Sequence, residues 1–256
     1  MISKKPICFL RAAIYASGAL AGIFQLLAAF LSFDPNANYF VRGAILPMIA
    51  CIFALVGVGC AIAFAFLAKA TLPEKKPAAF LPPAFFFCAL IPCVLSSADG
   101  SSKIADRLAI VAIILLIFSV LSCILPFFLK DQKHCGTLAL LGIAPVLALA
   151  ALPLYFYFDK SVEMNAPLKI DLQIGLLFGM FLFLCELRRL LDRPLPRLLI
   201  GLRLALFPIA SLGSFLLIPL AIAGSFRRLD YLFAGLLLLS LQAFFLFELP
   251  STHSDA

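Results

Sequence analysis

The chain has 256 residues, of which 64% are hydrophobic and 13% are charged, and its formal net charge is +7. Soluble domains contain about one half apolar and about one quarter charged residues, so this composition excludes a water-exposed globule. The basic residues lie in short clusters between apolar runs, which argues against a nucleic-acid-binding surface and favours the loops of a membrane protein.

Eight apolar runs follow one another along the chain, and each is long enough, at about 20 residues, to cross a ~30 Å hydrocarbon layer as a helix. The runs do not alternate as barrel strands do, and in lipid only helices or closed barrels satisfy the backbone groups. The sequence therefore predicts an all-α polytopic transmembrane helical bundle of about eight spans, with residues 1–256 forming a single integral membrane domain. The predicted spans are Ala12–Phe33, Gly43–Ala68, Phe80–Ser96, Leu108–Leu129, Leu138–Phe158, Ile170–Leu191, Leu198–Ala223 and Leu229–Leu249.

The loops between these runs are short, and the longest, from Asp159 to Lys169, leaves no room for a soluble domain. With the N-terminus inside, the inner segments carry twelve Lys and Arg residues and the outer segments seven, while Arg203 lies within a span. Because basic residues accumulate in cytoplasmic loops, this bias predicts a multi-pass protein of the cell (inner or plasma) membrane with both termini in the cytoplasm.

The two halves of the chain share features that are consistent with an internal repeat of residues 10–128 and 135–249. Phe33-Asp34 ends the first predicted span and Phe158-Asp159 ends the fifth, and Ile-Pro pairs stand at residues 91–92 and 218–219. Four spans per half would give a parallel repeat with a pseudo-two-fold axis along the membrane normal. The alternative is coincidence, because membrane sequences use few residue types and loops favour Pro, Asp and Asn.

Ionisable residues inside the spans are the first candidates for a site, because a charge in lipid is costly without a partner. Glu186 and Arg203 lie at similar distances from the turn between the sixth and seventh spans, so we predict an ion pair between them, or between Glu186 and Arg189. Guanidinium groups also bind phosphate in a forked geometry. The simpler interpretation is basic anchoring at the cytoplasmic surface, with Arg203 extending toward the interface. The candidate ion-pair or anionic headgroup site is Glu186, Arg189, Arg193, Arg197 and Arg203.

A few other polar and small residues stand out within the apolar runs. Gln25 and Gln242 lie in the middle of the first and last spans, where an amide usually bonds across a helix interface. Gly18 and Gly22 form a small-residue face that is predicted to pack on another helix. Asp171 stands at the start of the sixth span, where helix capping accounts for it.

The sequence contains no recognised catalytic or cofactor-binding signature. There is no H-E-x-x-H metal motif, no P-loop and no G-x-S-x-G elbow. None of the eight Cys residues forms a C-x-x-C pair, and those inside apolar runs are expected to act as small hydrophobes. We therefore predict no catalytic residues, no metal and no cofactor, and the sequence favours a non-enzymatic protein.

Three short stretches, Met164–Lys169, Glu186–Arg188 and Arg193–Arg197, resemble a group of uncharacterised multi-pass integral membrane proteins of anaerobic bacteria. That group has no assigned activity, so the resemblance implies a bacterial inner-membrane setting and carries over no site residues.

Two classes of function are compatible with these features. The first is a transporter or a protein that handles lipids or other amphiphiles, with a cavity between helices and the arginine cluster at its inner mouth. The second is a non-catalytic structural or accessory membrane subunit, whose helix faces pack against other chains. The predicted partners are membrane lipids, with anionic headgroups on the cytoplasmic side, together with a membrane protein or a second copy of the chain. Nucleic acid is not a predicted partner.

Overall fold

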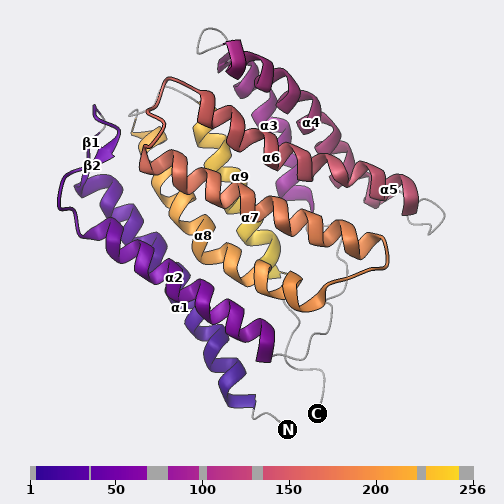
Figure 1. Ribbon diagram of the computed structural model, residues 1–256, viewed down its shortest axis with the longest axis horizontal. Coiled ribbons are helices and arrows are strands. Elements are labelled where there is room, and N and C mark those ends of the chain that lie inside the picture. The colour runs from indigo at the N-terminus through magenta and orange to yellow at the C-terminus, as the bar shows by residue number, and fades with distance from the viewer. Residues whose placement is uncertain are drawn as a thin grey trace.

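A computed structural model describes residues 4–34, 36–67, 80–97, 103–128, 135–223 and 229–247 (Figure 1). These residues form nine helices and one antiparallel pair of two-residue strands, in which Phe33 is opposite Phe40. The elements are α1 (Lys4–Leu31), β1 (Phe33–Asp34), β2 (Tyr39–Phe40), α2 (Leu46–Leu67), α3 (Leu81–Ser97), α4 (Lys103–Phe128), α5 (Cys135–Leu141), α6 (Ile143–Phe158), α7 (Pro167–Leu190), α8 (Pro196–Ile222) and α9 (Leu229–Phe247).

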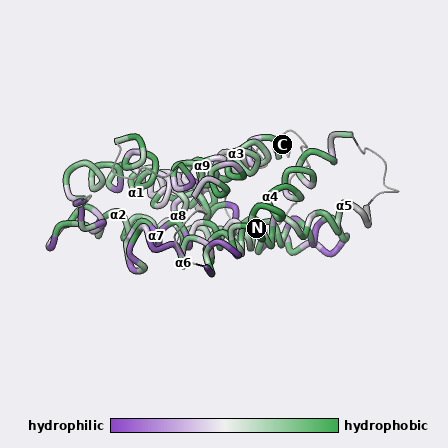
Figure 2. The backbone as a smooth tube through the Cα atoms, turned by 90° about the horizontal axis from the view of Figure 1, so that it is seen from above, coloured by the Kyte–Doolittle hydropathy of each residue, from purple (hydrophilic) through white to green (hydrophobic). Residues whose placement is uncertain are grey.

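The helices have the length and composition of membrane spans. In the described residues, six segments are long and apolar enough to cross a bilayer, and α3 and the first part of α9 are shorter apolar helices. Large hydrophobic side chains point away from the bundle, among them Leu55 on α2 and Phe85 on α3, and hydrophobic residues prevail along the helices (Figure 2). Such a surface would aggregate in water. The chain is therefore a multi-pass membrane protein, as predicted.

The fifth predicted span, Leu138–Phe158, is divided between α5 and α6 by a turn at Gly142. Pro145, three residues further on, has no N–H to bond the carbonyl of Leu141, and its ring crowds that carbonyl. The helical hydrogen bonding is interrupted one turn before the proline, with Pro145 in the first turn of α6, where its missing N–H costs nothing. Gly142 keeps helical dihedral angles, and Leu138–Phe158 remains one candidate span.

Six helices form a closed ring in the order α3, α4, α6, α7, α8 and α9, each packed against the next and α9 against α3. α1 and α2 form a pair that packs against α8 on one flank of this ring (Figure 1). α8 is thus the one helix in the described part of the chain that contacts four others extensively, namely α1, α2, α7 and α9.

The interior of the ring is filled by apolar side chains. Phe87, Leu116, Leu152, Leu216 and Leu238, from five different helices, are fully buried in one continuous hydrophobic cluster. Close packing of this kind is typical of a protein core. The filled interior leaves space for a ligand only beside the ring in the described part of the chain.

The small-residue face of α1 allows this helix to approach α8 closely. A Cβ atom at Gly18 would lie 2.3 Å from Cδ1 of Phe207, and one at Gly22 would lie 3.0 Å from the Phe215 ring. A side chain at Gly18 would require the Phe207 ring to move, and one at Gly22 would require a smaller shift of the Phe215 ring. The prediction that Gly18 and Gly22 pack on another helix is confirmed, with α8 as the partner.

The packing of the described helices does not follow the predicted internal repeat. A repeat of residues 10–128 and 135–249 would pair α2 with α7 and α3 with α8. α7 packs on α8, however, whereas α2 packs on α1 and α8 rather than on α3. The helices of the two halves are thus arranged in different orders, although the loops that bound them have similar sequences.

Candidate functional site

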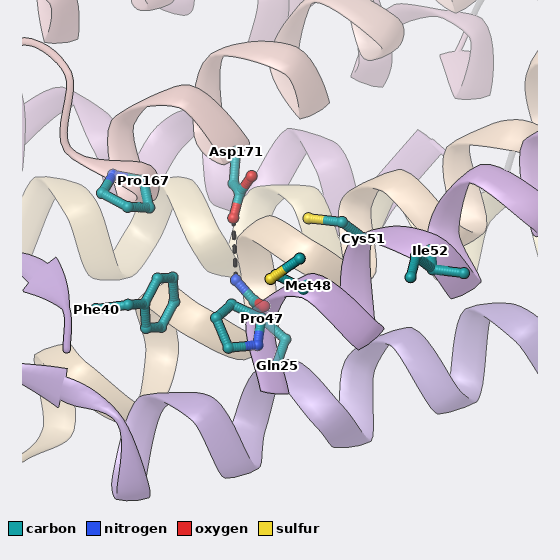
Figure 3. Close-up of a pocket in the computed structure, with 8 residues that line it drawn as sticks. All are labelled: Gln25, Phe40, Pro47, Met48, Cys51, Ile52, Pro167 and Asp171. Atoms are coloured by element: carbon teal, nitrogen blue, oxygen red, sulfur yellow. Dashed lines mark hydrogen bonds between the residues drawn. The ribbon is translucent and has the colours of Figure 1, made fainter. Parts of the chain in front are cut away.

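A pocket of about 370 Å³ lies where the pair α1–α2 meets the ring, near the ends of the helices at the β1–β2 hairpin (Figure 3). We call this end of the bundle the hairpin end. In the described part of the chain, α2 and α7 both pack against α8 rather than against each other, and the pocket occupies the space between them. Its volume is within the range of small-molecule sites. Its lining residues are Gln25, Phe40, Pro47, Met48, Cys51, Ile52, Pro167 and Asp171.

One polar pair stands within this apolar lining. Gln25 of α1 and Asp171 of α7 point toward each other, and Gln25 Nε2 donates a hydrogen bond of 3.0 Å to Asp171 Oδ2 (Figure 3). Gln25 is 1% exposed. Its amide therefore bonds across a helix interface, which is the arrangement that its position within the span predicts.

The structure corrects the interpretation of Asp171 as a cap. The N-cap of α7 is Ala166, with Pro167 in the first turn and no side-chain capping bond. Proline at this position already supplies the helical φ and lacks one of the N–H groups that a cap would satisfy. The Asp171 carboxyl lies more than a turn further along α7 and lines the pocket instead.

The β1–β2 hairpin lies beside the pocket and contributes Phe40 to its lining. The neighbouring Tyr39 lies near Glu163 of the loop between α6 and α7. Desolvation, together with the negative charge of Glu163, raises the pKa of the Tyr39 phenol. Residues of the α1–α2 pair, of the hairpin and of α7 thus surround the pocket.

The ionisable residues of the sixth and seventh predicted spans meet at the opposite end of the bundle. Arg203 Nη2 on α8 contacts Glu186 Oε1 on α7, and Arg189 Nη1 lies 3.6 Å from Glu186 Oε2. All three side chains are buried, and Arg203 is 2% exposed. One carboxylate is thus placed between two guanidinium groups, an arrangement that compensates much of the cost of burying it.

The other two arginines of the predicted cluster lie apart from this buried group. α7 ends at Leu190, and Asp192, two residues further on, lies in the left-handed region at φ 55°. There the N–H groups of Asp192 and Arg193 bond the carbonyls of Arg189 and Arg188, as in a Schellman motif. The chain turns sharply here, and Arg193 and Arg197 are exposed. The structure therefore divides the cluster into a buried ion-pair group and an exposed basic surface.

Gln242 binds within the ring rather than at a cavity. Its Nε2 donates to the Phe207 carbonyl at 3.2 Å and to Ser211 Oγ at 3.1 Å, both on α8. The Ser211 hydroxyl donates to the same carbonyl at 2.8 Å. This amide joins α9 to α8, so its role in the structure is to hold these two helices together.

A buried polar network at the hairpin end was missed by the sequence reasoning. Lys169 is 0% exposed, and its Nζ donates to the carbonyl of Asp159 and, at 2.6 Å, to that of Val162. Tyr231 donates to Asp159 Oδ2 at 2.9 Å. The network thus joins the end of α6 and the starts of α7 and α9.

A second part of this network lies beside the first. Tyr155 of α6 donates to Asp230 Oδ2 of α9 at 2.9 Å, and both residues are fully buried. The sequence places acidic and basic residues at the ends of three predicted spans on the same side of the membrane, which is a signal for such a network. It gives no indication of which of these residues turn inward.

The described residues give no sign of a metal centre. They contain no group of three or more His, Cys, Asp or Glu side chains that could hold a metal ion. Burial of Cys93, Cys123 and Cys185 in helix interfaces agrees with the interpretation of these thiols as small hydrophobes.

Comparison with known proteins identifies no relative of this chain. No family model, no curated protein and no solved structure matches it. The functional assignment therefore rests on the geometry of its own residues.

Proposed function

We propose that this protein binds a lipid or another amphiphile in the pocket between α2 and α7, as a transporter or lipid-handling protein of the membrane. The observation that carries the proposal is the pocket itself, which combines a mostly apolar lining with one polar pair, Gln25 and Asp171. An amphiphile has the same two parts, a polar head and an apolar body. Binding sites of this kind use a few placed polar groups for orientation and apolar contacts for affinity.

The position of the pocket supports lateral entry from the bilayer. Met48, Cys51 and Ile52 of α2 line the pocket and are also exposed on the surface of the bundle. Lipid chains surround this surface in the membrane, so an amphiphile reaches the polar pair without passing through water. The filled interior of the ring, by contrast, offers no support for a central route in this conformation.

The proposal predicts that one amphiphile is retained by each chain. We expect native mass spectra of protein purified in a mild detergent to show one bound amphiphile for the wild type and severalfold less for Cys51→Trp, because the indole would fill the pocket. Leu55→Trp is the matched control, since Leu55 is exposed on the same helix and lies outside the pocket lining. Equal retention by both variants, or no retention by the wild type, would contradict the proposal.

The alternative is a non-catalytic accessory or structural subunit. It is supported by the packed interior of the ring and by Gly59 of α2, beside which a Cβ atom would meet nothing within 4 Å. A helix of another chain could approach α2 closely at such a position. Purified protein that holds no amphiphile and elutes with a second membrane protein would favour this role.

We also propose eight crossings with both termini in the cytoplasm. α3 and α9 are short, but both are full members of the ring, and the helices run alternately toward and away from the hairpin end (Figure 1). This orientation turns the exposed Arg193 and Arg197 toward the anionic headgroups of the inner leaflet, where each basic residue contributes about 1 kcal/mol of attraction. A reporter that fluoresces only in the cytoplasm, fused after Ala256, should be bright. A dark fusion that is inserted in the membrane would rule out the cytoplasmic C-terminus.

A further inference from the structure

The polar side chains that line the pocket offer oxygen acceptors that a hydrogen-bond donor on a ligand could satisfy. Gln25 Oε1 is buried and accepts no hydrogen bond from any described residue. The Asp171 carboxylate accepts a bond from Gln25 Nε2, and no Lys, Arg or His of the described residues forms an ion pair with it. Two oxygen acceptors thus lie together at a pocket whose described lining contains no Lys, Arg or His.

Each of these two oxygen acceptors destabilises the protein when no ligand satisfies it. A buried carbonyl oxygen without a donor loses about 1–3 kcal/mol relative to one that is hydrogen-bonded. A carboxylate among apolar side chains is more costly still, unless a cation or a proton neutralises it. A ligand that carries both a positive charge and several N–H groups would remove both costs at once.

We propose that the pocket binds the primary ammonium group of an amphiphile, held by Asp171 and by the free oxygen of Gln25. This inference rests on the proposed function and adds the chemistry of the headgroup. An –NH₃⁺ group has three donors and one charge, which suits a carboxylate and an amide oxygen together. The apolar body of the ligand would lie against Met48 and Ile52, and the face of Phe40 can add a cation–π contact.

The depth of the site is consistent with a headgroup. Asp171 is four residues from Pro167, where α7 begins, which corresponds to about 6 Å along the helix axis. Ammonium groups of lipids are found at this level, between the water and the hydrocarbon. Two sources share the chemistry, the ethanolamine headgroup of a phospholipid and a free long-chain amine.

The experiment measures ligand preference by native mass spectrometry of the full chain in phosphatidylcholine nanodiscs. Separate samples contain added phosphatidylethanolamine, phosphatidylglycerol or dodecylamine. We expect phosphatidylethanolamine or dodecylamine to be retained about tenfold more tightly than phosphatidylcholine, because a trimethylammonium group has no N–H and one charge-assisted hydrogen bond is worth about that factor. Preference for phosphatidylethanolamine identifies a headgroup as the source, and preference for dodecylamine alone identifies a free amine.

Two variants locate the preference at this site. Asp171→Asn keeps an acceptor for Gln25 but removes the charge, and Gln25→Met removes the second acceptor, so each should reduce the preference about tenfold. Asp192→Asn is the control, because it removes one exposed carboxylate just beyond the far end of α7 and should leave the preference unchanged.

The possible failures are distinguishable. Retention of phosphatidylcholine or phosphatidylglycerol as tight as that of the amines would overturn the ammonium assignment and leave the amphiphile pocket standing. An amine preference that survives in Asp171→Asn would likewise overturn it. Loss of all retention in the wild type would overturn the proposed function itself.

Discussion

Replacing Lys169 by methionine is expected to destabilise the protein by about 3–5 kcal/mol, because two buried carbonyl groups lose their donor and each unsatisfied group costs about 1–3 kcal/mol. The side chain is 0% exposed and donates to the carbonyls of Asp159 and Val162. Methionine fills a similar volume but leaves both carbonyls without this donor. The start of α7 would then be held less firmly to the end of α6.

Thermal unfolding in detergent, followed by circular dichroism, measures this effect. Lys160→Met is the control, because Lys160 is exposed in the loop that precedes α7 and its loss should change the stability little. A Lys169→Met protein that unfolds at the temperature of the Lys160→Met protein would show that the buried network adds no net stability.

The second large effect is expected for Arg203→Met, again about 3–5 kcal/mol, because Glu186 would remain buried with only the longer contact to Arg189. The double variant Glu186→Leu with Arg203→Met should regain most of this loss, since it removes the charges together. Buried ion pairs replaced by apolar residues are often no less stable than the original.

The comparison requires four proteins, the wild type, Glu186→Leu, Arg203→Met and the double variant, unfolded under the same conditions. The difference between the double variant and the sum of the single variants gives the coupling of Glu186 and Arg203. A double variant less stable than Arg203→Met would show that Glu186 is satisfied without Arg203. Arg197→Met, at an exposed position, should have little effect in the same assay.

The helices were the most predictable part of this molecule. In lipid the backbone must satisfy its own hydrogen bonds, so long apolar runs specify helices without any knowledge of their neighbours. The interruption between α5 and α6 follows from local chemistry too, because Pro145 cannot continue the helix. The closed ring could not be foreseen, since neighbouring spans in lipid have nearly uniform apolar surfaces that do not reveal their partners.

The sites were less predictable, for a related reason. Glu186 and Arg189 are three residues apart and so share a helix face, which local spacing reveals. The contact between Gln25 and Asp171 joins α1 to α7, and sequence spacing carries no information about it. Lys169 looked like one more basic loop residue, because its burial depends on the path of the loop around its ammonium group.

The attachment of α1 and α2 to α8 has a consequence for how the protein is made. Ribosomes add about 5–20 residues per second, so roughly ten seconds pass between completion of α2 at Leu67 and the appearance of α8 at Pro196. During this time α1 and α2 can pack against each other but not yet against α8. The stacked rings of Phe24 and Phe53, with centroids 5.6 Å apart, join them directly and need no later part of the chain.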